Sequence, residues 1–71
     1  MTQRPLTGRQ AEVLAWIVSH RDLHGYSPTY REIAAHFCVF PGAIAGHVHA
    51  LVAKGVLIGA PGVARGLVPV A

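Results

Sequence analysis

Apolar residues in the first three quarters of the chain recur every three or four positions, which is the period of a helix rather than a strand. In residues 8–24 this stripe consists of Val13, Leu14, Ile17 and Val18, flanked by Trp16. Thr7 and Gln10 form a capping-box pattern in front of the stripe, and Gly25 is suited to the left-handed residue that follows a helix. The pattern therefore predicts a first helix over residues 8–24.

Two further helical patterns follow a short connector. Ser27 precedes a proline, which favours extended backbone, and Thr29 with Glu32 forms a second capping-box pattern. Residues 30–37 then predict a short helix whose inward residues are Ile33, Ala34 and Phe37. After a turn at residues 38–40, proline at the first position of a helix indicates a third helix that Lys54–Gly55 closes. Pro41 begins this helix, and its inward residues are Ile44, Val48, Leu51 and Val52.

The pattern changes after Gly55. Residues 56–60 and 66–70 are short runs rich in β-branched residues, and residues 61–65 between them contain the turn pair Pro61–Gly62. Two antiparallel strands are predicted, and Pro69 makes the second an edge strand. We therefore expect a mainly α (α+β) winged helix-turn-helix: a tail at residues 1–5, then one domain over 6–71. A plain three-helix bundle is the alternative.

Composition narrows the class of protein. The 71 residues carry a formal net charge of +3, and 52% of them are hydrophobic. A basic excess favours an anionic partner, although charged residues make up only 13% of the chain. The single cysteine excludes an intrachain disulfide, and no apolar run approaches the roughly 20 residues of a membrane span. With no signal-peptide pattern at the start, we expect a cytoplasmic, nucleoid-associated protein that does not bind membranes.

Four segments, in order, resemble the N-terminal DNA-binding domain of the LexA repressor family. They are LTGRQAEVLAWI, GYSPTYREIA, HVHALVAKGVL and PGVARGL, and together they extend over residues 6–67. The positions that fit the family pattern are Leu6, Thr7, Arg9, Gln10, Gly25, Pro28, Thr29, Glu32, Ile33, Ala34, His47, Leu51, Lys54, Gly55, Gly62, Arg65 and Gly66. The resemblance implies a winged helix-turn-helix that binds duplex DNA and represses transcription.

The sequence departs from the family pattern in two respects. It contains no counterpart of the family's self-cleaving C-terminal domain, so we expect no autoproteolysis from these residues. The turn at residues 38–40 is about one residue shorter than the family's. Where the family places Ser, Asn and Glu for base contacts, the chain has Phe40, Gly42, Ala45 and Gly46. The fold is therefore implied, but the family's operator is not.

The outward face predicted for the third helix has few polar groups. A step of 100° per residue places outward Gly42, Gly46, His49, Ala50 and Ala53, with Ala43 on the flank. Only His49 among them can hydrogen-bond a base edge, whereas strong direct readout uses Arg, Asn or Gln. Small residues permit close approach and apolar contact with thymine methyl groups. They equally permit another helix or subunit to pack there.

Phosphate contacts are expected mainly from the second helix. Thr29 and Tyr30 begin it, Arg31 follows, and a helix N-terminus attracts anions. Arg65 in the hairpin is expected to reach phosphate or the minor groove, with a structural ion pair to Glu32 as the alternative. Arg9 and Lys54 are positioned to flank the duplex, with an ordinary solvated charge as the alternative, and for Arg9 and Arg21 that alternative is at least as strong. The predicted DNA-binding set is Thr29, Tyr30, Arg31, Phe40, Gly42, Ala43, Gly46, His47, His49, Lys54 and Arg65.

Metal binding and catalysis have little support in the sequence. His20 and His24 lie four residues apart and His36 lies near Cys38, but a structural zinc site needs four converging ligands. We expect no metal and no cofactor, and we expect Cys38 to be half-buried rather than a redox sensor. Since the three acidic residues are spread along helices and no catalytic motif is present, the chain is not expected to be an enzyme.

The expected partner is double-stranded DNA, bound by the third helix and the wing. A homodimer on a palindromic site would raise the affinity, and residues 66–71 are a candidate dimer surface. Two alternatives stay open: a protein-interaction module or anti-repressor that uses the same face, and a non-specific binder of duplex DNA.

Overall fold

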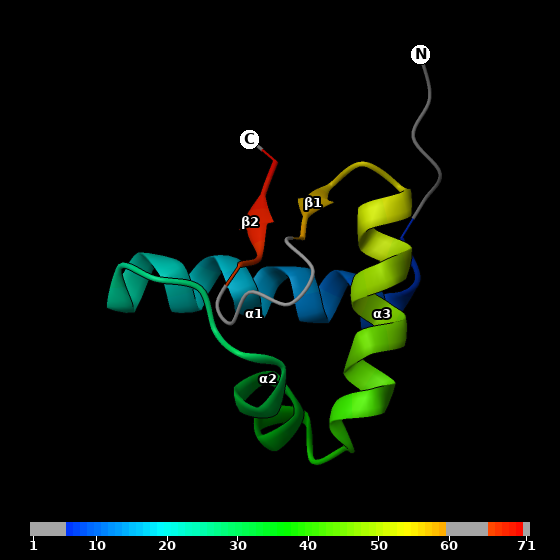
Figure 1. The fold of residues 1–71 in the computed structure, drawn as a ribbon, viewed down its shortest axis with the longest axis horizontal. Coiled ribbons are helices and arrows are strands. Elements are labelled where there is room, and N and C mark those ends of the chain that lie inside the picture. Colours follow the sequence, from blue (N-terminus) through cyan, green and yellow to red (C-terminus); the bar gives the residue numbers. More distant parts are fainter. Residues whose placement is uncertain (1–5, 60–65, 71) are drawn as a thin grey trace.

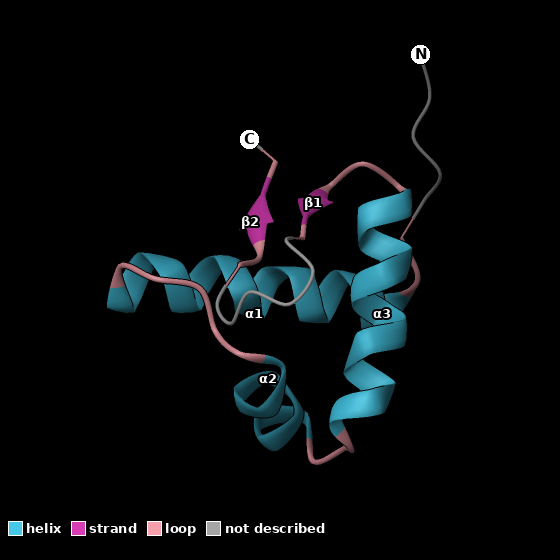
Figure 2. Cartoon of the chain, viewed as in Figure 1, coloured by secondary structure: helices cyan, strands magenta, loops and turns pink. Residues whose placement is uncertain are grey.

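The computed structural model describes residues 6–59 and 66–70, which form three helices and a small sheet (Figures 1 and 2). In chain order the elements are α1 (Gly8–His24), α2 (Tyr30–Phe37), α3 (Pro41–Ala53), β1 (Leu57–Ile58) and β2 (Val68–Pro69). Figure 1 shows α3 beginning beside α2 and ending near the start of α1, with the strands on the other side of α1 from α2. The predicted winged helix-turn-helix is confirmed.

The ends of α1 and α2 follow from their local sequences. In α1 the Thr7 hydroxyl oxygen accepts a hydrogen bond from the Gln10 backbone N–H, and the Gln10 side chain accepts one from the Thr7 N–H, both at 3.2 Å. Thr29 and Glu32 make the same reciprocal pair at the start of α2. Gly25 ends α1 with a left-handed φ of 79°. All three local predictions are confirmed.

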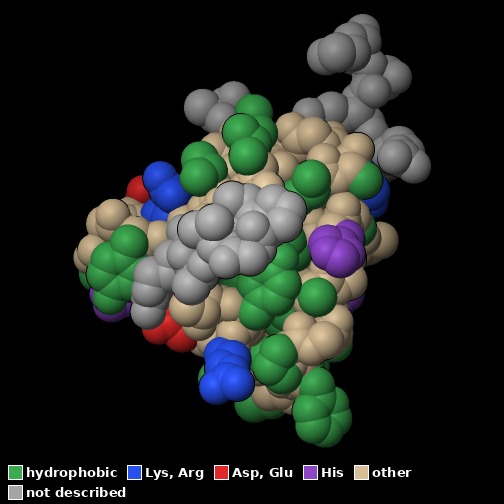
Figure 3. All heavy atoms as spheres, in the orientation of Figure 1, with side chains coloured by type: hydrophobic (Ala, Val, Ile, Leu, Met, Phe, Trp, Pro, Cys, Tyr) green, Lys and Arg blue, Asp and Glu red, His purple; other side chains and the backbone are tan. Residues whose placement is uncertain are grey.

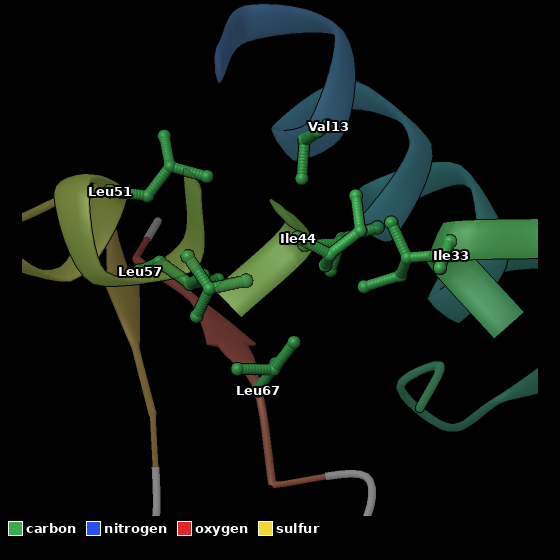
Figure 4. Packing of buried hydrophobic residues seen from close by; sticks show 9 residues of the cluster. Val13, Ile33, Ile44, Leu51, Leu57 and Leu67 are labelled. Carbon is green, nitrogen blue, oxygen red and sulfur yellow. The ribbon is translucent and has the colours of Figure 1, made fainter. Parts of the chain in front are cut away.

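The core lies where the three helices meet the strands. Figure 4 shows side chains from α1, α2, α3 and the wing converging on one centre. The buried hydrophobic residues are Val13, Ile17, Ile33, Ala34, Ile44, Val48, Leu51, Leu57 and Leu67. The predicted core extended too far at its edges, because Val18 and Val52 are exposed while Leu14 and Phe37 are only partly buried. Neighbouring elements pack on the centre of each apolar stripe. They do not fully cover the edge positions Leu14, Val18, Phe37 and Val52.

The wing is shorter than predicted and is fixed to α1. Its strands pair antiparallel, with Leu57 opposite Pro69, and the predicted turn at residues 61–65 lies outside the described residues. The buried Ser27 hydroxyl donates a hydrogen bond to the carbonyl oxygen of Leu67, just before β2. Arg21 of α1 donates to the Ser27 hydroxyl at 2.8 Å and contacts the same carbonyl at 3.4 Å. Arg21 is therefore a structural residue, not a free surface charge.

Within residues 6–59 and 66–70, no single helix is long and apolar enough to cross a membrane. Helices α2 and α3 meet the length and composition criteria only when taken together, and a bend of 109° separates them. The buried residues of both helices belong to the core described above.

Candidate nucleic-acid interface

Helices α2 and α3 form a helix-turn-helix with a tight turn. The 109° between them lies within the 90–120° typical of this motif. Cys38 closes α2 in a left-handed conformation with φ of 58°, and the Val39 N–H donates back to the Ala34 carbonyl at 3.0 Å. Cys38 is exposed, so the prediction of a half-buried thiol was wrong. The left-handed turn leaves this side chain on the outside, where no other element packs on it.

The outward face of α3 is built from small residues and one imidazole. Opposite the buried Ile44, Val48 and Leu51, the exposed positions of the helix are Pro41, Gly42, Ala43, Gly46, His49, Val52 and Ala53. His47 and Ala50, at the margins of this face, are half-buried. Figure 3 shows the side of the molecule that carries α3 as mostly hydrophobic and backbone surface, with separated histidine and basic side chains. The face is accessible and carries almost no hydrogen-bonding side chains.

The two glycines of this face are not required by packing within the chain. A Cβ atom added to Gly42 or Gly46 would meet nothing within 4 Å. Glycine in a helix interior costs up to roughly 1 kcal/mol relative to alanine. The described part of the fold therefore has room for a Cβ atom at both positions, and no contact within it requires a glycine there.

The start of α3 also departs from what a helix favours. Phe40 occupies the N-cap, makes no side-chain capping hydrogen bond and is 85% exposed. Ser, Thr, Asp and Asn are favoured at this position, and their loss costs about 1 kcal/mol. Pro41 at the first helical position supports the helix start, as predicted. Phe40 thus leaves the helix uncapped and places an aromatic ring in water.

The predicted phosphate contacts on α2 are not equally free. Arg31 is exposed in the first turn, whereas Thr29 and Tyr30 are half-buried. The Glu32 carboxylate accepts the Thr29 N–H at 2.9 Å, so a negative charge already occupies part of this helix N-terminus. Arg31 is therefore the group of this set that is best placed to meet a phosphate.

Two other basic residues of the predictions have intramolecular partners. The Lys54 ammonium donates to the Gln10 side-chain oxygen at 2.6 Å, which joins the end of α3 to the capping box of α1. Arg9 pairs with Glu12 at 3.2 Å and lies 5.1 Å from the centre of the Phe37 ring. Arg65 lies outside the described residues. No local sequence pattern could predict the contact of Lys54, because its partner Gln10 lies 44 residues earlier in the chain.

The histidines of α1 and α2 form an aromatic surface cluster. The rings of His20 and His24 are 4.3 Å apart, and Trp16 stacks against His36 at 4.8 Å. Among the described residues, no group of three or more His, Cys, Asp or Glu side chains is arranged to hold a metal ion. These histidines contact aromatic neighbours, and His20 Nδ1 also lies 3.2 Å from the Tyr26 carbonyl oxygen, so the cluster has a packing role.

The acidic residues are distributed unevenly. All three of them, Glu12, Asp22 and Glu32, lie within the first 32 positions, and residues 33–71 contain no Asp or Glu. The turn, α3 and both strands therefore carry no carboxylate side chain. Such a surface does not repel a polyanion.

The model of the LexA DNA-binding domain matches residues 3–66 of this sequence. The chain belongs to the LexA DNA-binding domain family. A protein named LexA repressor 2 from Geobacter sulfurreducens is 49% identical over 63 residues, which is 87% of this chain and 31% of that protein. The LexA repressor of Geotalea uraniireducens is 42% identical over 64 residues, or 89% of this chain and 32% of the relative.

The LexA repressor of Pseudothermotoga lettingae is 40% identical over 55 residues, covering 78% of this chain and 28% of the relative. The chain thus spans about a third of the length of these LexA repressors. The part of the family to which it corresponds is the DNA-binding domain. The resemblance stated from the sequence is confirmed, and with it the assignment to a LexA-type winged helix-turn-helix.

Proposed function

We propose that this LexA-type domain binds duplex DNA by placing α3 in the major groove, and that it represses transcription by occupying an operator. In a helix-turn-helix the second helix enters the groove while the first crosses the backbone. The observation that supports this best is the accessible outward face of α3, on a fold shared with proteins named LexA repressors. The absence of Asp and Glu from residues 33–71 agrees with a polyanionic partner.

In this proposal the contacts divide into two kinds. Arg31, with Thr29 and Tyr30 beside it, contacts phosphates and sets the orientation of the domain. Phe40, Gly42, Ala43, Gly46, His47 and His49 face the bases, while Lys54 and Arg65 flank the duplex. Phosphate contacts give salt-dependent affinity without sequence information. Arg31 is the one exposed arginine on α2 and α3, so a lone domain is expected to bind weakly, and a homodimer on two half-sites would strengthen binding. The site of action is then the bacterial cytoplasm.

The test is a binding titration with genomic and random duplexes at several salt concentrations. Arg31→Ala should weaken binding to all sequences alike and should reduce the slope of log affinity against log salt by about one. If the wild-type chain binds no duplex at low salt, DNA is excluded as the partner. Equal affinity for every duplex would exclude an operator.

A charge placed on α3 tests which face meets the DNA. Gly46→Glu should reduce affinity at least tenfold, because the carboxylate would face the bases and phosphates. The fold should tolerate it, since Gly46 is exposed with nothing near an added Cβ. Ala15→Glu on the exposed side of α1 makes the same change of charge and should leave binding nearly unchanged. If both variants bind alike, α3 does not enter the groove.

A protein partner is the second candidate for this face. The specific observation in its favour is the scarcity of hydrogen-bonding side chains, since His49 is the one such group that is exposed on α3. In that case Gly46→Glu would disrupt a protein complex while the wild-type chain failed to bind duplex DNA at low salt.

A further inference from the structure

Phe40 stands out among the apolar side chains that lie outside the core. At 85% exposure it is the most exposed large hydrophobic residue of the described part of the chain. It lies at the start of α3, in the turn that forms one tip of the molecule in Figure 1, where Figure 3 shows hydrophobic surface. The ring is therefore presented at the end of the helix that we propose enters the groove.

Nothing in the described part of the chain accounts for a phenylalanine at this position. An N-cap favours a short polar side chain, and Phe40 supplies no capping hydrogen bond. The ring is not part of the core and is not among the hydrophobic residues packed against it. The missing cap and the exposed ring both lower the stability of the chain on its own. A role for Phe40 therefore has to be sought in a contact with a partner.

The proposed function limits what that contact can be. The N-terminal residues of a recognition helix contact base edges in the major groove. In that groove only thymine presents a methyl group, and a phenylalanine ring is one of the groups that contact it. The residues next to Phe40 on the outward face, Gly42 and Ala43, have no side-chain group that would hydrogen-bond a base. His49 lies nine residues further on, about 13 Å along the helix axis.

We propose that Phe40 is a specificity-determining residue that contacts a thymine methyl group at the N-terminal end of α3. This inference rests on the proposed DNA binding and adds to it the base that is recognised. A protein partner would also cover an exposed ring. The exposed Arg31 in the first turn of α2 and the lack of Asp and Glu after residue 32 favour the polyanion.

The experiment begins with selection of duplexes from a random-sequence DNA library by the wild-type chain. In the selected duplex each thymine is then replaced by deoxyuridine, which removes the methyl group and leaves base pairing unchanged. Loss of one buried methyl should weaken wild-type binding about fourfold at one position. Phe40→Ala should bind the thymine duplex more weakly than the wild type does. Replacing thymine by uracil at that position should not weaken binding by the variant any further.

Two further variants separate readout from helix stability. Phe40→Ser restores a capping group, so it should raise the melting temperature and still lose the preference for thymine over uracil. Leu23→Ala removes another large hydrophobic side chain, 80% exposed on α1, and should keep the full preference. A structural role for Phe40 would instead make stability and preference change together.

The outcomes distinguish this inference from the proposed function. If the chain selects a duplex but uracil is tolerated at every position, or affects Phe40→Ala as much as the wild type, the thymine contact is wrong and DNA binding stands. If no duplex is bound at low salt, both proposals fail. If all duplexes bind equally, the operator and the thymine contact fail together.

Discussion

The two helices of the helix-turn-helix begin in opposite ways. Thr29 and Glu32 complete both halves of a capping box at the start of α2. Phe40 starts α3 without a side-chain cap and with its ring in solvent. Helix α2 is therefore held partly by its own end groups, whereas α3 depends on its inward side chains. Local preferences are satisfied at the helix start that is proposed to contact only phosphates, and they are violated at the start of the helix that is proposed to face the bases, which is where a site of sequence recognition is expected to show.

The same contrast separates the two faces of α3. On the inward face Ile44, Val48 and Leu51 are almost completely buried and form part of the core. On the outward face, an added Cβ atom at Gly42 or Gly46 would meet no atom of the described residues within 4 Å. The inward face fixes the position of the helix, so the outward face is free to be shaped by its partner. This division can be tested by substitutions on each side.

Ile44→Ala should have the largest effect on stability. The side chain is fully buried, and truncating a buried isoleucine typically costs about 2–5 kcal/mol. A domain of this size is stable by only about 4–11 kcal/mol, so the variant should lose a large fraction of its free energy of unfolding. Urea denaturation followed by circular dichroism measures the loss. A change below about 1 kcal/mol would show that α3 is not held by its inward face.

The elements themselves were predictable because their signals are local. Thr7 with Gln10, Thr29 with Glu32, and Gly25 each act within one turn of the residues they cap. The core centre followed from the helical period. Its edge did not, because the exposure of Val18 and Val52 depends on which neighbouring element covers each side of a stripe. No single-helix pattern contains that information.

The candidate interface was predictable only in part. The outward position of Gly46 and His49 followed from the period of α3. The contact of Lys54 with Gln10 could not be foreseen, because it joins helices whose relative placement is set by the core. The same holds for Arg21, whose partners Ser27 and Leu67 meet it only in the folded chain. Long basic side chains find their partners after the fold has formed.

Ser27→Ala should have the next largest effect. It leaves the buried carbonyl of Leu67 without its hydroxyl donor, which costs about 1–3 kcal/mol. Arg21 already contacts that carbonyl at 3.4 Å, so we expect the lower end of this range. Amide hydrogen exchange should show faster exchange at Val70, whose N–H donates to Val56, than at α2. Equal acceleration throughout the chain would mean that Ser27 does not anchor the wing specifically.

Thr29→Ala tests the difference between the two helix starts directly. Removing this cap should cost about 1 kcal/mol of the free energy of unfolding. Phe40→Ala is the matched variant at the N-cap of α3, and it should change stability by less than about 0.5 kcal/mol, since no capping bond is lost. Urea denaturation of both variants gives the comparison. Equal losses would show that Phe40 contributes to stability as much as the cap of α2.

Gly46→Ala should have the smallest effect and the opposite sign. Gly46 is exposed and an added Cβ meets nothing within 4 Å, so the variant should gain up to about 1 kcal/mol from helix propensity. Gly55→Ala is the matched control: it also has open space, but its φ of 78° is left-handed, so alanine there should cost about 1–2 kcal/mol. Thermal unfolding measures both signs. A gain in stability at Gly46 that comes with weaker binding to the selected duplex would show that the glycine serves the interface. A loss of stability there would instead mean that the fold itself requires it.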